Sequence, residues 1–241
     1  MLSRDTYLRA LRHDGHAFAD ASRDALDRAV DGCPGWVIRD LVIHITEVHA
    51  FWNFIALTGM SGPDKYERPA DVPETELVAT FLEGLDALME TLTSSDEASS
   101  CWTWDGPHDI AWISRRMAQE MAVHAWDART AIGDRTPIDA SLASDGIDEF
   151  VHMMMRYPMP DSLSLAGSVH LHCIDVDGEW LIVPHGDELT ITREHAKGSC
   201  AMRGTAHNLL MVLWRRYDLT DVEVIGDAAI AAQFVSRADL R

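Results

Sequence analysis

The stretch "PGWVIRDLVIHITEVHAFW" spans residues 34–52 and predicts a helix that starts just after a Pro–Gly break. Proline and glycine end the preceding helical pattern, and apolar residues then recur at helical spacing. We therefore expect a helix over residues 37–57. His44 lies one turn from Leu41 and two turns from Val37, so it shares their apolar stripe, which should face the protein interior.

Helical spacing continues on both sides of this segment and fills most of the first 155 residues. The five expected helices cover residues 4–30, 37–57, 73–92, 111–132 and 139–157. Helices of this length with loops between them are typical of an antiparallel bundle. The loops at residues 60–73 and 95–110 are long for a bundle. Such loops often carry function, and disorder is the plain alternative.

The pattern changes after residue 160, where apolar and polar residues alternate. An Asp177–Gly178 turn joins two alternating runs, which is typical of a β-hairpin, and a third strand is expected at residues 189–192. A helix, a strand and a second helix then complete a small α+β unit, at residues 204–216, 222–227 and 228–238.

The sequence thus predicts a two-domain protein of the α+β class. Residues 1–158 form the N-terminal antiparallel helical bundle, and residues 159–241 form the small C-terminal α+β domain. The stretch "PMPDSLSLAG", residues 158–167, has the proline and serine content of a linker between them.

Composition limits the classes of partner. The chain of 241 residues has a formal net charge of −19, which repels nucleic acid phosphates and anionic lipids, so we expect neither as a partner. The N-terminus lacks the apolar core of a signal peptide, and no run approaches eighteen apolar residues. The four cysteines include no C-x-x-C pair and do not suggest a disulfide framework. We therefore expect a cytoplasmic protein, either monomeric or homodimeric.

The segment "EMAVHAWDAR", residues 120–129, places Glu120 and His124 four residues apart on one side of the expected fourth helix. One helix can offer two ligands to a metal ion in this way, although an ordinary amphipathic face has the same spacing. His44 is the candidate third ligand, and the alternative is a core histidine bonded to a neighbouring carbonyl. Two histidines and a carboxylate leave one position open, as in catalytic zinc sites, and nickel, iron or manganese also fit these residue types.

Three further residues bear on this candidate site. Asp127 either orients His124 through a hydrogen bond or faces solvent. Glu47 and His49 are the backup ligands if His44 does not bind the metal.

Together the two segments resemble the mycothiol-dependent maleylpyruvate isomerase family, which has "PGW-t-v-r-DL-x-x-H-L" and "E-x-x-x-H-x-W-D-A" motifs and belongs to the DinB-like superfamily of metal-binding bundles. Residues 209–227, "LLMVLWRRYDLTDVEVIGD", are similar to the C-terminal pattern of that family. The resemblance implies that His44, Glu120 and His124 bind a divalent metal, usually zinc. Ala125 departs from the family, in which an arginine is common at this place.

The resemblance also implies an enzyme that uses the low-molecular-weight thiol mycothiol as cosubstrate, with a small electrophile as the second substrate. A thiol bound to a dication loses its proton and becomes a nucleophile. Addition of that thiolate to an activated C=C bond permits cis–trans isomerisation, and attack at an electrophilic carbon gives S-transfer. A metallohydrolase, a thiol-independent biosynthetic enzyme and a non-catalytic binding protein are the alternatives on the same bundle.

Other residues are weaker candidates. Arg215 and Arg216 follow the apolar run of a predicted C-terminal helix and are the candidate cofactor-binding residues. Arg116 precedes Glu120 and is expected mainly as a surface charge. No residue is assigned as catalytic.

His170 and His172 alternate on a predicted strand and share one side, which is a chelating geometry. With no third ligand in view, both are expected as exposed strand residues. Cys33 is expected as a small, half-buried residue rather than a nucleophile. Trp104 is expected in the core, with a pocket wall as the alternative.

Overall fold

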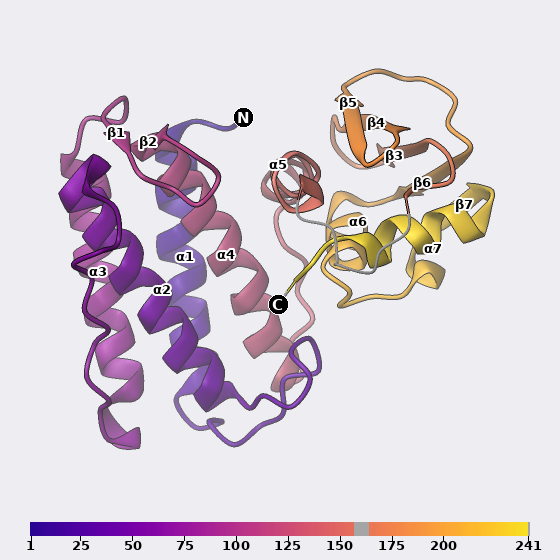
Figure 1. Ribbon diagram of the computed structural model, residues 1–241. Helices are drawn as coiled ribbons and strands as arrows, with labels where there is room; N and C mark the ends of the chain where they lie inside the picture. Colours follow the sequence, from indigo (N-terminus) through magenta and orange to yellow (C-terminus); the bar gives the residue numbers. More distant parts are fainter. Residues whose placement is uncertain (157–163, 241) are drawn as a thin grey trace. The chain divides into compact units, whose positions relative to one another are not determined.

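The computed structural model describes residues 1–156 and 164–240 (Figure 1). The chain divides into two compact units, Met1–Pro137 and Ile138–Arg241, which we call the bundle unit and the sheet unit. The predicted class, α+β with N-terminal helices and a C-terminal sheet, is confirmed. The observed division precedes the boundary expected at residue 158, and most of the expected linker lies outside the described residues.

Four α-helices build the bundle unit, whose residues are all described: α1 (Arg4–Ser22), α2 (Ile38–Thr58), α3 (Leu77–Ser94) and α4 (Ile110–Ala131). Helix α1 packs against α3 and α4, and α2 packs against the same two helices. Leu11, Phe18, Leu41, Phe81 and Leu85 are buried between them. Burial of each such side chain contributes about 1.5–3 kcal/mol relative to exposure, so these apolar stripes hold the bundle together.

Helix α1 ends at Ser22, well before the expected end at residue 30. The Ser22 hydroxyl donates a hydrogen bond of 2.7 Å to the carbonyl of Phe18. The chain then turns, and the backbone N–H of Val30 donates to the carbonyl of Trp36 at 3.0 Å. Val30 is buried, so it reaches the core from a turn and not from a helix.

The loop at residues 95–110 contains a short antiparallel pair, β1 (Ser100–Cys101) and β2 (His108–Asp109), which was not expected. Asp109 also caps helix α4, because its carboxylate accepts a hydrogen bond of 2.9 Å from the backbone N–H of Trp112. The Asp109 cap and the β1–β2 pair together fix where helix α4 begins.

Helix α2 and the following 3-10 turn are long and apolar enough, by length and composition only, to cross a membrane. Arg39, Asp40 and Glu47 interrupt its apolar residues, so no run in it approaches eighteen apolar residues. In the bundle unit, α2 contacts α3 and α4 and buries Leu41, Ile45 and Ile55. Such packing is typical of the core helix of a bundle.

Five strands form the mixed sheet of the sheet unit in the order β5-β4-β3-β6-β7, counted over the described residues. Their bounds are β3 (Val169–Cys173), β4 (Glu179–His185), β5 (Glu188–Thr192), β6 (Cys200–Gly204) and β7 (Glu223–Gly226). Strands β3 and β6 are parallel, and the other neighbours are antiparallel. Helices α6 (Ala206–Leu213) and α7 (Ala228–Arg237) contact both β3 and β6.

Helix α5 (Ala140–His152) belongs to the sheet unit, whereas the sequence placed it in the bundle. It packs against α6, with the rings of Phe150 and Trp214 5.2 Å apart. The indole N–H of Trp180 on β4 donates to Asp148 of α5 at 2.9 Å. The periodicity of an amphipathic helix predicts a buried face but not the element that covers it.

Short 3-10 turns complete the described fold: η1 (Gly59–Ser61), η2 (Glu74–Glu76), η3 (Met154–Arg156) and η4 (Leu219–Asp221).

Candidate metal centre

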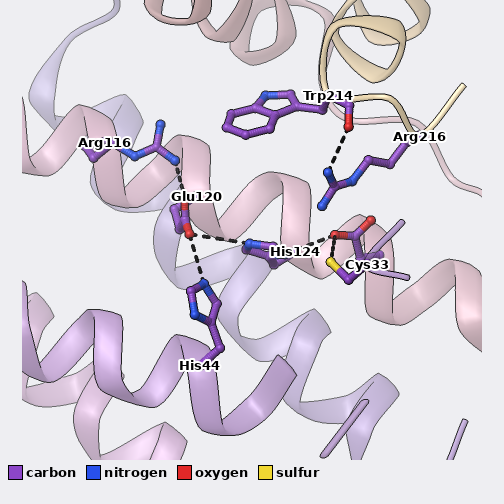
Figure 2. Close-up of polar contacts among 8 residues, drawn as sticks. Cys33, His44, Arg116, Glu120, His124, Trp214 and Arg216 are labelled. Atoms are coloured by element: carbon purple, nitrogen blue, oxygen red, sulfur yellow. Dashed lines mark hydrogen bonds and ion pairs between the residues drawn. The ribbon is translucent and has the colours of Figure 1, made fainter. Parts of the chain in front are cut away.

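The structure brings His44 of α2 together with Glu120 and His124 of α4 (Figure 2). Glu120 Oε1 lies 3.4 Å from His44 Nε2 and 3.4 Å from His124 Nε2. The centroids of the two imidazole rings are 5.4 Å apart. One donor atom from each residue lies within 4.8 Å of the other two. A nitrogen–nitrogen–oxygen set at this spacing fits one divalent ion with a further position open.

The second oxygen of Glu120 forms an ion pair with Arg116, one turn earlier on α4. The Arg116 side chain is only 2% exposed, so its expectation as a surface charge is wrong. Burial raises the pKa of the Glu120 carboxyl, but the Arg116 guanidinium and hydrogen bonds from His124 and His44 outweigh burial and hold the pKa well below its usual range. Glu120 is therefore ionised and oriented, as a metal ligand must be.

Asp127 holds the other nitrogen of His124, since its carboxylate lies 3.0 Å from His124 Nδ1. The Asp127 side chain is fully buried, so of the two roles left open by the sequence, the structure supports orientation of His124. A carboxylate on the far nitrogen fixes the ring and leaves Nε2 for an ion.

The same contacts control the charge of His124. Burial lowers the pKa of this imidazole, but hydrogen bonds with Asp127, Cys33 and Glu120 outweigh burial and raise the pKa well above its usual value. An ion that binds Nε2 must displace a proton from that ring.

Cys33 adds a thiol to this neighbourhood. Its Sγ lies 3.8 Å from Asp127 Oδ2, and it forms a second possible donor group with His124 and Asp127. Cys33 is half-buried, as expected. No sequence pattern indicated that Cys33 lies beside Asp127, because the two residues are far apart along the chain.

The backup ligands do not join the donor group. Glu47 pairs with Arg68 at 2.5 Å. His49 is completely buried, and within the described residues neither of its ring nitrogens has a hydrogen-bond partner. Its ring lies 5.5 Å from that of Phe81. Burial lowers the pKa of His49 to about 4, so it stays neutral in the core at neutral pH.

A cavity of about 370 Å³ lies beside the donor group within the bundle unit. His44, Arg116 and Glu120 line one part of it. Aromatic rings line much of the rest, from Phe51, Trp52, Tyr66 and Trp104. Trp104 is thus a pocket wall, the alternative that the sequence left open. The loop residues Tyr66 and Arg68 were not anticipated, because loop sequence carries no periodic pattern that places it.

Residues 8–129 match the family model described as the mycothiol maleylpyruvate isomerase N-terminal domain. The chain belongs to this family. Among solved structures, the chain is similar to a histidine-to-alanine mutant of the mycothiol-dependent maleylpyruvate isomerase, with a TM-score of 0.62, and to the crystal structure of that isomerase, with 0.57. Both matches have 11% sequence identity and cover 92% of this chain and 93% of the other. At this identity they show the fold. No curated protein matches the sequence.

The family match includes all three candidate ligands, His44, Glu120 and His124. Ala125, the departure from the family motif noted in the sequence, is fully buried in α4. The Ala125 side chain therefore packs inside the bundle unit and adds no charge to the candidate metal centre.

The candidate cofactor-binding residues of this family member lie in the sheet unit. Arg215 takes a left-handed backbone conformation, φ 59°, just after α6. Its guanidinium donates to the carbonyls of Val235 and Ala238, at 3.1 and 2.5 Å. Arg216 donates to the carbonyl of Trp214 at 2.9 Å, as Figure 2 shows. Cofactor binding by these two arginines stays a prediction.

Proposed function

We propose that His44, Glu120 and His124 bind a divalent metal ion, with zinc as the first candidate, and that the protein is an enzyme that uses a low-molecular-weight thiol. The observation that carries this proposal is the convergence of three donor atoms from two helices beside an aromatic cavity. Three protein ligands and one open position are the arrangement of catalytic zinc sites.

A bound dication would lower the pKa of a thiol, so that a thiolate nucleophile is present at neutral pH. The protein's own residues prepare the site for this. Asp127 keeps Nε2 of His124 available, and Arg116 keeps Glu120 ionised. The aromatic walls give a substrate an apolar surface to pack against, and a cavity of about 370 Å³ suits a small electrophile.

Mycothiol is the proposed cosubstrate, and S-transfer or cis–trans isomerisation is the proposed reaction. Family membership supports the thiol, and both similar solved structures are of a mycothiol-dependent maleylpyruvate isomerase. The proposal further includes small-molecule partners, with neither nucleic acid nor membrane among them, and a cytoplasmic location. Arg215 and Arg216 remain the proposed contacts to the thiol cosubstrate.

Untagged protein, a His124→Ala variant and a His13→Ala control test this proposal. The control removes an exposed histidine of the same unit, 80% exposed, outside the donor group. Elemental analysis should show about one metal equivalent less in His124→Ala than in the other two proteins. Calorimetric titration with mycothiol should give heat with wild type and control, and none with His124→Ala.

The alternatives give different results. Turnover of ester or amide substrates without any thiol would contradict the thiol enzyme and favour a metallohydrolase. Unchanged metal content in His124→Ala would reject the metal site itself. Protein that carries no metal, loses no stability and binds no thiol would favour a non-catalytic binder.

A further inference from the structure

A second group of metal-ligating side chains lies in the sheet unit, apart from the bundle residues described above: His170, His172, Glu179 and His195. His170 and His172 are on β3, and Glu179 is on β4 directly opposite His172. Directly paired residues point to the same face of a sheet, so these three share a face. Val169 and Leu171 alternate with the histidines and are buried on the other face.

His195 completes the group from the segment between β5 and β6. Its Nδ1 lies 3.0 and 2.9 Å from the two oxygens of Glu179. His172 Nδ1 lies 2.7 Å from Glu179 Oε1, and His170 Nε2 lies 3.7 Å from Glu179 Oε2. One donor atom from each of the four residues lies within 4.8 Å of all the others.

Two of the imidazoles have buried nitrogens that point into this group without a hydrogen bond. The His170 side chain is 8% exposed, and its Nε2 has no hydrogen-bond partner within the described part of the chain. His172 Nδ1 has no hydrogen bond there either, although it forms an ion-pair contact of 2.7 Å with Glu179 Oε1. A buried polar atom without a partner costs about 1–3 kcal/mol, so the buried His170 nitrogen, 3.7 Å from Glu179 Oε2, calls for a ligand.

We propose that His170, His172, Glu179 and His195 bind a second divalent transition-metal ion, of which Zn²⁺ is the best match. Three imidazoles and one carboxylate are the donor types that zinc takes in proteins. Four protein ligands fill a tetrahedral shell, so the site is structural and leaves no position for substrate. Its effect is to tie the segment that carries His195 to strands β3 and β4.

A network of hydrogen bonds around Glu179 is the simpler explanation of the group. Such a network would satisfy His195, which donates to Glu179, but would leave His170 Nε2, 3.7 Å from Glu179 Oε2, without a hydrogen bond. A single ion accounts for all four side chains at once, and this favours the metal site.

Zinc binding by the full chain, without a histidine tag, tests the proposal. The protein is treated with chelator, dialysed, and titrated with Zn²⁺ by calorimetry, with elemental analysis of the washed product. Wild type is compared with His195→Ala and Glu179→Gln. His185→Ala serves as the matched control, because His185 is an exposed histidine at the end of β4, outside the group.

Each of His195→Ala and Glu179→Gln should bind about one equivalent less Zn²⁺ than wild type, and His185→Ala should bind as much. Zinc should also slow amide hydrogen exchange in residues 193–199 of wild type, and not in His195→Ala. Equal zinc stoichiometry in wild type, His195→Ala and Glu179→Gln would overturn the proposal. The variant His124→Ala reports on the bundle site alone, so failure of one site is distinguished from failure of the other.

Discussion

The bundle and the sheet each bring imidazoles and a carboxylate together, but they do so in different ways. In the bundle, Glu120 and His124 follow the spacing of a helix, and His44 comes from a neighbouring helix. In the sheet, His170 and His172 follow the spacing of a strand, and the remaining donors come from β4 and from a connecting segment. Regular spacing thus supplies two donors in each unit, and tertiary packing supplies the rest.

The two groups differ in what surrounds the donors. Two buried charged side chains, Arg116 and Asp127, orient the bundle donors, and a cavity opens beside them. In the sheet, the carboxylate of Glu179 is itself one of four donors, and His195 is 78% exposed. An oriented, incomplete shell beside a cavity suits catalysis, whereas a complete shell at a surface suits structural binding.

The largest expected difference between the two groups is the loss of stability when their carboxylates, Glu120 and Glu179, are neutralised. In chelator-treated protein, Glu120→Gln should lower the free energy of unfolding by about 3–5 kcal/mol, because it removes the charge that faces the buried Arg116. Glu179→Gln should cost below about 1 kcal/mol, because the side chain is 26% exposed and faces imidazoles. Urea unfolding of both variants measures this. Equal losses of unfolding free energy in the two variants would contradict the claim that the Glu120 carboxylate contributes more to stability than the Glu179 carboxylate.

The buried His49 of the bundle unit should make the protein less stable in acid. Its pKa is lowered by burial from 6.5 to about 4, so the unfolded chain takes up this proton at a higher pH than the folded chain. Stability therefore falls as pH drops from about 6.5 to about 4, by about 3 kcal/mol from this residue.

Unfolding of wild type, His49→Leu and the exposed control His185→Leu across this pH range measures the contribution. The loss of stability with falling pH should be smaller in His49→Leu than in the other two proteins. Parallel curves for all three would mean that His49 does not remain neutral in the folded chain.

The smallest of these effects concerns orientation in the bundle site. Asp127→Asn should weaken Zn²⁺ binding at the bundle site by about 10–100-fold, because His124 loses the carboxylate on its far nitrogen. Asp134→Asn, which changes a carboxylate paired with Arg129 at the surface, is the control. Calorimetry in a His195→Ala background reports this site alone. If Asp127→Asn leaves the Zn²⁺ affinity of the bundle site unchanged, then Asp127 does not orient His124 for metal binding.

Sequence predicted the elements whose pattern is local. Apolar stripes located four bundle helices, and the spacing of Glu120 and His124 pointed to a shared face. It could not place α5, because periodicity does not name the covering element, and it missed β6, whose partner β3 is parallel and distant in the chain. The burial of Arg116 and the position of His195 were missed for the same reason: both depend on packing between segments that no short-range pattern connects.

Anomalous diffraction at the zinc edge, from crystals of the zinc-loaded protein, tests the central claim most directly. The account predicts a peak about 2.0–2.1 Å from Nε2 of His44 and of His124, and about 2.0–2.2 Å from the Glu120 carboxylate. Zinc-loaded crystals with no peak between these three side chains would contradict it.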